Sequence, residues 1–153
     1  MKRNDVKSSC PVNFTLEIFG DAWSLLIIRD MISIGKKTFG EFLASDERIG
    51  SSVLTERLTH LEQKGIISKQ PDSFDKRKSM YHLTESGLDL IPIMYEISVW
   101  GTHTSPNPAA SPEWFASLKY DRDVVVAAYR RAVAAGSSFS NGPDSVVNQL
   151  GLL

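Results

Sequence analysis

The stretch IGSSVLTERLTHLEQKGII, residues 49–67, constrains the fold more than any other part of the chain, because its apolar residues recur with the period of an α-helix. The inward face of this helix is formed by Leu54, Leu58 and Leu61. The opposite face carries Ser52, Glu56, Thr59 and Gln63, flanked by Thr55 and His60. Ser51 is the expected N-cap, and Gly65 is expected to end the helix. The pattern therefore predicts an amphipathic helix over residues 51–64 with a polar outward face.

The neighbouring elements complete a known arrangement. A short helix at residues 41–44 and a turn at Ile49–Gly50 precede the amphipathic helix. Two short strands, Ile66–Gln70 and Ser79–Leu83, follow it, and the loop PDSFDKRK between them is too long and too polar for a tight turn. A short helix, a turn and a longer helix form a helix-turn-helix, whose second helix enters the major groove of DNA. The two strands would add a wing.

The predicted DNA-binding residues lie on this second helix and at the tip of the wing. They are Ser51, Ser52, Thr55, Glu56, Thr59 and His60 on the helix, and Lys76, Arg77 and Lys78 on the wing. Small polar side chains let a helix come close to base edges, and its N-terminal amides attract phosphate oxygens. The basic tip would neutralise phosphates without reading sequence. Two roles remain open for Glu56: it accepts a hydrogen bond from a cytosine amine, or it repels phosphates and is held by Arg57 or His60.

The segment before the helix-turn-helix contains the only cysteine, Cys10, directly before Pro11. Because proline suits the first turn of a helix, a helix is expected to begin there. Its apolar face is formed by Val12, Leu16 and Phe19. Gly20 is expected to end this helix in a left-handed conformation, and Asp21 is expected to cap the next one. That next helix, from Ala22 to about Ser33, is apolar nearly all round and therefore belongs in the centre of the domain.

Beyond the wing, a helix is expected from Thr84 towards Gly101, with a kink at Pro92. Its broad apolar surface is formed by Leu88, Ile91, Met94, Tyr95, Ile97 and Trp100. So much apolar surface on a peripheral helix indicates a protein partner. The segment TSPNPAASPEW has the composition of a linker, a further helix is expected over residues 121–135, and residues 137–153 are expected to be loose.

Composition limits the function. A chain of 153 residues suits one domain, and its net charge of −1 lacks the overall basicity of many nucleic-acid binders, so a basic site must be local. A single cysteine excludes an internal disulfide framework and a cysteine-based zinc cluster. The polar start MKRNDVKSS and the lack of a long apolar run predict a cytoplasmic protein without a membrane span. No metal and no cofactor are expected.

Four segments carry a resemblance to a known family: CPVNFTLEIFGDAWSLLIIRD, TFGEFL, IGSSVLTERLTHLEQKGII and YHLTESGLDLIPIMYEISVWG. In their order and spacing, over about residues 10–101, the chain resembles the HxlR-type winged helix-turn-helix transcriptional regulators of bacteria. The resemblance implies a homodimer built through residues 11–19 and 84–103, with residues 51–64 of each subunit in a major groove. The dimer-interface candidates are Val12, Leu16, Phe19, Ile91, Met94, Tyr95 and Trp100.

A two-fold dimer predicts an inverted-repeat operator, since it places two recognition helices about 34 Å apart or a multiple of that distance. Three positions depart from the family pattern. Glu56 stands where an uncharged polar residue is frequent, Gly40 where a capping serine is common, and Ser52 where proline is frequent. The operator sequence is therefore not inferred from the family.

The predicted fold is mainly α with a small β-hairpin: a winged helix-turn-helix with dimerisation helices at both ends and a C-terminal helical extension. Its expected parts are a flexible N-terminal arm (residues 1–9), the DNA-binding and dimerisation domain (10–104), a linker (105–119), and a C-terminal helix with a loose tail (120–153). The expected partners are double-stranded DNA, a second copy of the chain, and a small-molecule or oxidant effector.

Three other classes compete with this interpretation. A MarR-like ligand-responsive regulator would share the wing region but not the Cys-Pro-Val and Gly-Asp-Ala-Trp segments. A winged-helix protein-interaction module without DNA binding would suit the near-neutral charge and Glu56. An enzyme would need Cys10 with His60, His82 or His103, and the sequence has neither a nucleophile elbow nor a glycine-rich phosphate loop.

For Cys10 two roles remain open. A thiol at a helix N-terminus lies near the positive end of the helix dipole, which favours the reactive thiolate and hence redox or electrophile sensing. With no second cysteine in the chain, oxidation would give an intersubunit disulfide, a mixed disulfide or a sulfur oxyacid. The other role is that of a small residue packed near the dimer contact.

Overall fold

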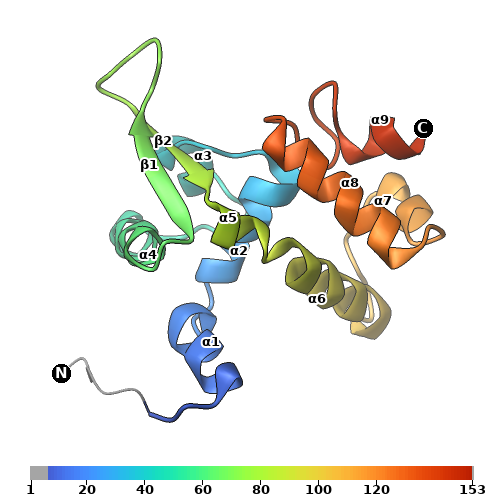
Figure 1. The fold of residues 1–153 in the computed structure, drawn as a ribbon, viewed down its shortest axis with the longest axis horizontal. Helices are drawn as coiled ribbons and strands as arrows, with labels where there is room; N and C mark the ends of the chain where they lie inside the picture. Colours follow the sequence, from blue (N-terminus) through green and yellow to red (C-terminus); the bar gives the residue numbers. More distant parts are fainter. Residues whose placement is uncertain (1–6, 153) are drawn as a thin grey trace.

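A computed structural model describes residues 7–152, and Figure 1 shows their arrangement. The helices and strands are α1 (Pro11–Phe19), α2 (Ser24–Arg29), the π-helix η1 (Asp30–Ile34), α3 (Phe39–Leu43), α4 (Ser51–Gln63), β1 (Ile67–Pro71), β2 (Ser79–Leu83), α5 (Glu85–Leu88), α6 (Ile91–Thr104), α7 (Pro112–Ser117), α8 (Arg122–Ala134) and α9 (Val146–Leu150). The prediction of a mainly helical winged helix-turn-helix with one β-hairpin is confirmed. The N-terminal arm expected at residues 1–9 lies mostly outside the described residues.

The core of the helix-turn-helix forms where α4 meets the central helix α2. The three leucines of α4, Leu54, Leu58 and Leu61, are all buried, as the helical period predicted. Helix α3 packs against α4 and buries Phe42. Its start is capped by Thr38, whose hydroxyl accepts the amide of Glu41 at 3.3 Å, so α3 needs no capping side chain at Gly40.

The wing is an antiparallel pair in which Ile67 lies opposite Leu83 and Pro71 opposite Ser79. Its root is tied to the body, because Thr38 forms an isolated bridge with Met80 and the Tyr81 amide donates to the carbonyl oxygen of Lys37 at 2.7 Å. The position of the wing relative to the segment before α3 is therefore set by backbone hydrogen bonds.

The junction between α1 and α2 differs in detail from the sequence-based expectation. Gly20 has a φ of −76°, so it is not left-handed. Glycine is required there for another reason: a Cβ at this position would lie 2.3 Å from the carbonyl oxygen of Leu16. Asp21 does hold the next helix, since its carboxylate accepts the amides of Trp23 and Ser24, each at 2.8 Å. The helix itself begins at Ser24 and widens into a π-helix from Asp30.

The helix expected from Thr84 to Gly101 is two helices. Helix α5 ends at Leu88 and α6 begins at Ile91, so Pro92 stands in the first turn of α6 and produces no kink within a helix. Proline favours this position because its missing N–H would have no partner there.

The linker and loose tail expected after residue 104 are folded against the body. Trp114 on α7 is buried, and its indole N–H donates to the hydroxyl oxygen of Thr102 at 2.9 Å. The Trp114 ring packs edge-on against Tyr95 and Phe139, with 5.8 and 6.3 Å between ring centroids. The Phe139 ring stacks on Tyr129 with 5.4 Å between centroids. These ring contacts pack α7, α8 and the segment before α9 against α6. Figure 1 shows this C-terminal part on the side of the molecule away from α4.

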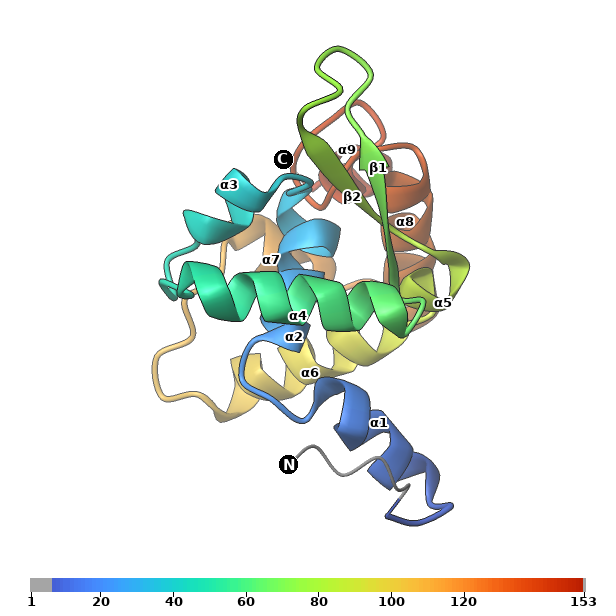
Figure 2. The same cartoon turned by 90° about the vertical axis from the view of Figure 1, so that its left-hand side faces the viewer.

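Helix α1 extends away from the body in both views (Figures 1 and 2). Its apolar residues Val12, Phe14 and Leu16 are exposed, whereas Ile18 and Phe19 at its end are buried. Within residues 7–152 no helix alone is long and apolar enough to cross a membrane; α1 and α2–η1 meet that test only as a pair bent by 80°.

Candidate nucleic-acid interface

The outward face of α4 is a polar surface of mostly short side chains, with Glu56 as its one carboxylate. Figure 2 shows the helix across the front of the molecule with the wing rising beside it. Ser51, Ser52, Thr55, Glu56 and Thr59 are all exposed on it. The N-cap is Gly50 and not Ser51, because Ser51 is already helical. Since glycine has no side chain to cap the first amides of α4, these N–H groups suit a phosphate oxygen.

Glu56 is paired within the protein. Arg57 donates to Glu56 at 2.6 Å and also reaches the Asp21 carboxylate at 3.3 Å, so one guanidinium joins α4 to the start of α2. Burial raises the pKa of Asp21, but hydrogen bonds from the Ser24 hydroxyl and the Trp23 and Ser24 amides, together with the charge of Arg57, give a net lowering. The interpretation of Glu56 as a residue held by Arg57 therefore has a direct structural basis.

His60 faces α1. It is half-buried, and its Nε2 lies 3.2 Å from the backbone oxygen of Ile18. Because a carbonyl oxygen only accepts, Nε2 must carry the hydrogen in this contact. His60 thus joins the recognition helix to α1, and its position on the flank of α4 limits any contact with DNA.

The tip of the wing is an ordered loop. The Asp72 carboxylate accepts the amides of Phe74 and Asp75 at 2.7 and 3.0 Å, and these backbone bonds hold its pKa below the usual range. Arg77 bonds the Asp75 carboxylate at 3.0 Å, and this bond lowers the pKa of Asp75. Lys76 and Lys78 are exposed, and no carboxylate of residues 7–152 forms an ion pair with either.

Two further residues of this surface were missed by sequence reasoning. Phe74 is 100% exposed at the tip of the wing, where an aromatic ring gains nothing from the protein itself. Arg48, in the turn before α4, is exposed and has a φ of 57°, a left-handed conformation that is unusual for arginine. The sequence signal for Phe74 was a lone aromatic in an otherwise polar loop. Arg48 showed no such signal, since a single arginine in a turn is common.

A buried carboxylate fixes the turn that precedes α4. Asp30, in the π-helix, is 2% exposed and accepts hydrogen bonds from Arg29 at 2.6 Å, Lys36 at 2.9 Å and Ser45 at 2.6 Å. Arg29 also holds Glu47 at 2.6 Å, which lowers the pKa of Glu47 to about 2 and raises that of Arg29. This network ties the central helix to the turn on which the recognition helix depends.

The candidate dimer residues divide into two groups. Phe19, Ile91, Met94 and Tyr95 are buried within the subunit, whereas Val12, Leu16 and Trp100 are exposed. Phe14, Ile93 and Ile97 are exposed as well. The six exposed residues together are called the apolar surface of α1 and α6: Val12, Phe14, Leu16, Ile93, Ile97 and Trp100. Cys10 is exposed and is the N-cap of α1, without a capping bond from its thiol. No group of three metal-ligating side chains is present within residues 7–152.

Comparison with known proteins agrees with this geometry. The HxlR-like helix-turn-helix family matches residues 18–108. The uncharacterized HTH-type transcriptional regulator YybR of Bacillus subtilis (strain 168) is 38% identical over 95 residues, which is 62% of this chain and 75% of YybR.

Two solved structures are similar. The redox regulator HypR in its oxidized form is 33% identical with a TM-score of 0.57, covering 64% of this chain and 100% of HypR. The reduced form of the transcriptional regulator YodB from B. subtilis is 27% identical with a TM-score of 0.52, covering 65% of this chain and 97% of YodB. The chain therefore belongs to the HxlR-like helix-turn-helix family of transcriptional regulators.

Proposed function

We propose that this regulator binds duplex DNA as a homodimer, with α4 in the major groove and the wing against the backbone. The observation that carries the proposal is that α4 and the wing lie on the same side of the molecule (Figures 1 and 2), and that the small polar residues of α4 and the basic residues of the wing tip are exposed. Ser51, Ser52, Thr55 and Thr59 offer short hydrogen-bonding groups to base edges and phosphates. Lys76, Arg77 and Lys78 concentrate positive charge at the wing tip in a chain whose net charge is −1.

Phe74 adds an apolar group to the wing. Its ring stands beside the three basic residues on a loop held by Asp72, so a wing that approaches the backbone brings the ring to the neighbouring groove. Apolar side chains in such positions contact sugars or enter between base steps. We expect Phe74 to increase affinity by this contact.

Dimerisation uses the apolar surface of α1 and α6 in this proposal. Exposed side chains such as Val12, Leu16 and Trp100 have no cover in a single subunit, and burial against a second copy would remove their apolar area from water. A two-fold axis through this surface presents two α4 helices about one DNA turn, or a multiple of it, apart. The operator is then an inverted repeat.

The test is a gel shift with the DNA upstream of the protein's own gene. A complex that weakens steeply with salt, is competed by the same duplex and is not competed by a scrambled duplex supports the proposal. No salt-sensitive complex at any protein concentration would overturn it. Sedimentation of the free protein and of a Leu16→Glu variant tests the dimer, because a charge in an apolar interface favours the monomer.

Cys10 is proposed as the redox-responsive group of this regulator. The proposal is supported by the exposed thiol at the start of α1, next to the apolar surface of α1 and α6, and by similarity to a protein named as a redox regulator. Oxidation there would form an intersubunit or mixed disulfide or a sulfur oxyacid, any of which alters the surface near the dimer contact. DNA affinity is to be compared for wild type and Cys10→Ser, with and without hydrogen peroxide. Identical responses of the two proteins would exclude the role.

A further inference from the structure

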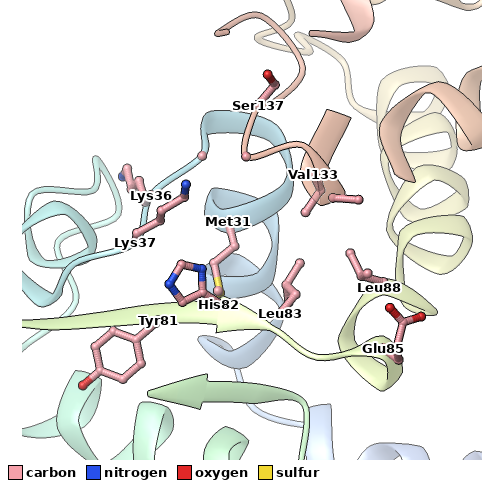
Figure 3. Close-up of a pocket in the computed structure, with 13 residues that line it drawn as sticks. Met31, Lys36, Lys37, Tyr81, His82, Leu83, Glu85, Leu88, Val133 and Ser137 are labelled. Atoms are coloured by element: carbon pink, nitrogen blue, oxygen red, sulfur yellow. The ribbon is translucent and has the colours of Figure 1, made fainter. Parts of the chain in front are cut away.

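A cleft of about 380 Å³ lies between the wing strand β2 and the end of helix α8. Its walls come from β2, the turn that follows η1, α5, and the end of α8 (Figure 3). The residues from α8 onward lie beyond residue 108, where the family match ends. Four of the thirteen residues that line this cleft therefore belong to the part of the chain that the family does not describe.

One end of the cleft carries positive charge. Figure 3 shows Lys37 and His82 at this end, with Lys36 nearby. The Lys36 ammonium is already bound by Asp30 at 2.9 Å and Ser45 at 2.7 Å. The half-buried Lys37 differs, because no acceptor within residues 7–152 hydrogen-bonds its ammonium. Burial and the nearby charge of Lys37 both lower the pKa of His82. An anion at this end would relieve that repulsion.

Apolar side chains line much of the rest of the cleft. Met31, Leu83, Leu88 and Val133 line it, and Figure 3 shows Leu88 and Val133 across from the lysines. Glu85 stands beyond Leu88 and is held by Arg130 of α8 at 2.8 Å, so this second end disfavours a negative group. The volume lies within the range of roughly 300–1,000 Å³ that small-molecule sites occupy.

We propose that this cleft binds a small organic carboxylate, with its carboxylate on Lys37 and its apolar body against Met31, Leu83 and Val133. Such a ligand would touch the wing strand β2 and helix α8 at once, and so would link the wing to the C-terminal extension. Binding itself does not depend on DNA. Only the role of the ligand as an effector rests on the proposed function.

The test is calorimetric titration with phenylacetate, and with its neutral isostere phenylacetamide as the control ligand. Wild type is expected to bind the acid and not the amide. Lys37→Met should weaken phenylacetate binding by about tenfold to a hundredfold, since a charge-assisted hydrogen bond is lost while the stem remains. Lys119→Met, at an exposed lysine after α7, is the matched control and should leave binding unchanged.

A second variant and a second signal make the test independent of folding effects. Val133→Phe fills the apolar end without changing charge and should also abolish binding. In wild type, phenylacetate should raise the pKa of His82 measured by NMR, because the anion offsets the charge of Lys37. Equal binding of acid and amide, or unchanged affinity in Lys37→Met, would overturn the site. Inorganic phosphate that binds as tightly as phenylacetate would overturn the organic ligand class.

The effector role has its own test, a gel shift with and without saturating phenylacetate. A changed DNA affinity supports that role, and by linkage DNA must then change phenylacetate affinity by the same factor. An unchanged DNA affinity overturns the effector role alone. If phenylacetate binds in the calorimeter but the gel shift shows no DNA complex, the result supports the ligand site and contradicts the proposed DNA-binding function.

Discussion

Replacement of Lys76 by alanine tests the role of the wing most directly. Lys76 is exposed, and no carboxylate of residues 7–152 pairs with it, so its removal deletes one charge without leaving an unpaired partner. Arg77 is less suitable, because its loss would leave the Asp75 carboxylate uncompensated near the phosphates. In a dimer each substitution removes two phosphate contacts, and the slope of log K against log salt should fall by about 1.8, at about 0.9 for each contact.

The expected change in slope can be measured as a ratio of affinities at two salt concentrations. Between 50 and 200 mM salt, a difference of about 1.8 in slope reduces the affinity ratio of wild type to Lys76→Ala by about 12-fold. Fluorescence anisotropy with an operator duplex and a scrambled duplex gives this ratio at each salt concentration. Lys119→Ala is the matched control, since this exposed lysine follows α7 and belongs to neither α4 nor the wing. An unchanged slope, or an altered preference between the two duplexes, would refute the assignment of Lys76 to phosphate contact.

Three further predictions concern Phe74 on the wing, Trp114 in the C-terminal core and the Glu47 carboxylate. Phe74→Ala should weaken binding to DNA without lowering the melting temperature, because the ring is 100% exposed; an unchanged affinity in anisotropy would remove it from the interface. Trp114→Ala should destabilise the fold by about 3–5 kcal/mol and lower the melting temperature by about 6–20 °C in calorimetry, and a shift near zero would mean that the C-terminal part is not held by this residue. Because the pKa of Glu47 is lowered from 4.5 to about 2, its contribution to stability is present above pH 4.5 and is lost as the pH falls towards 2. Denaturant unfolding of wild type and Glu47→Gln should therefore differ at pH 7 and converge near pH 2, and a constant difference would contradict the pairing with Arg29.

The periodic parts of the sequence determined the helix-turn-helix and the wing. Leu54, Leu58 and Leu61 repeat at helical spacing, and this spacing alone decides which face of α4 is buried and which is exposed. The two strands flank a loop that is too long and too polar for a tight turn, which was enough to predict the hairpin and its basic tip. Both predictions rest on local geometry, which is why one sequence without structural information sufficed for them.

The tertiary structure decided which apolar and polar groups find partners. The apolar residues of α6 gave no sign that Ile91, Met94 and Tyr95 would be covered within the subunit while Trp100 would be left exposed. Trp114 and Phe139 pack against each other, so the segments predicted to be a linker and a loose tail are folded. His60 contacts α1. Lys37 and His82 line one cleft together with residues of α8. An amphipathic pattern records that a face is apolar, but the choice of what covers it depends on residues far away in the sequence, because packing is a property of the whole chain.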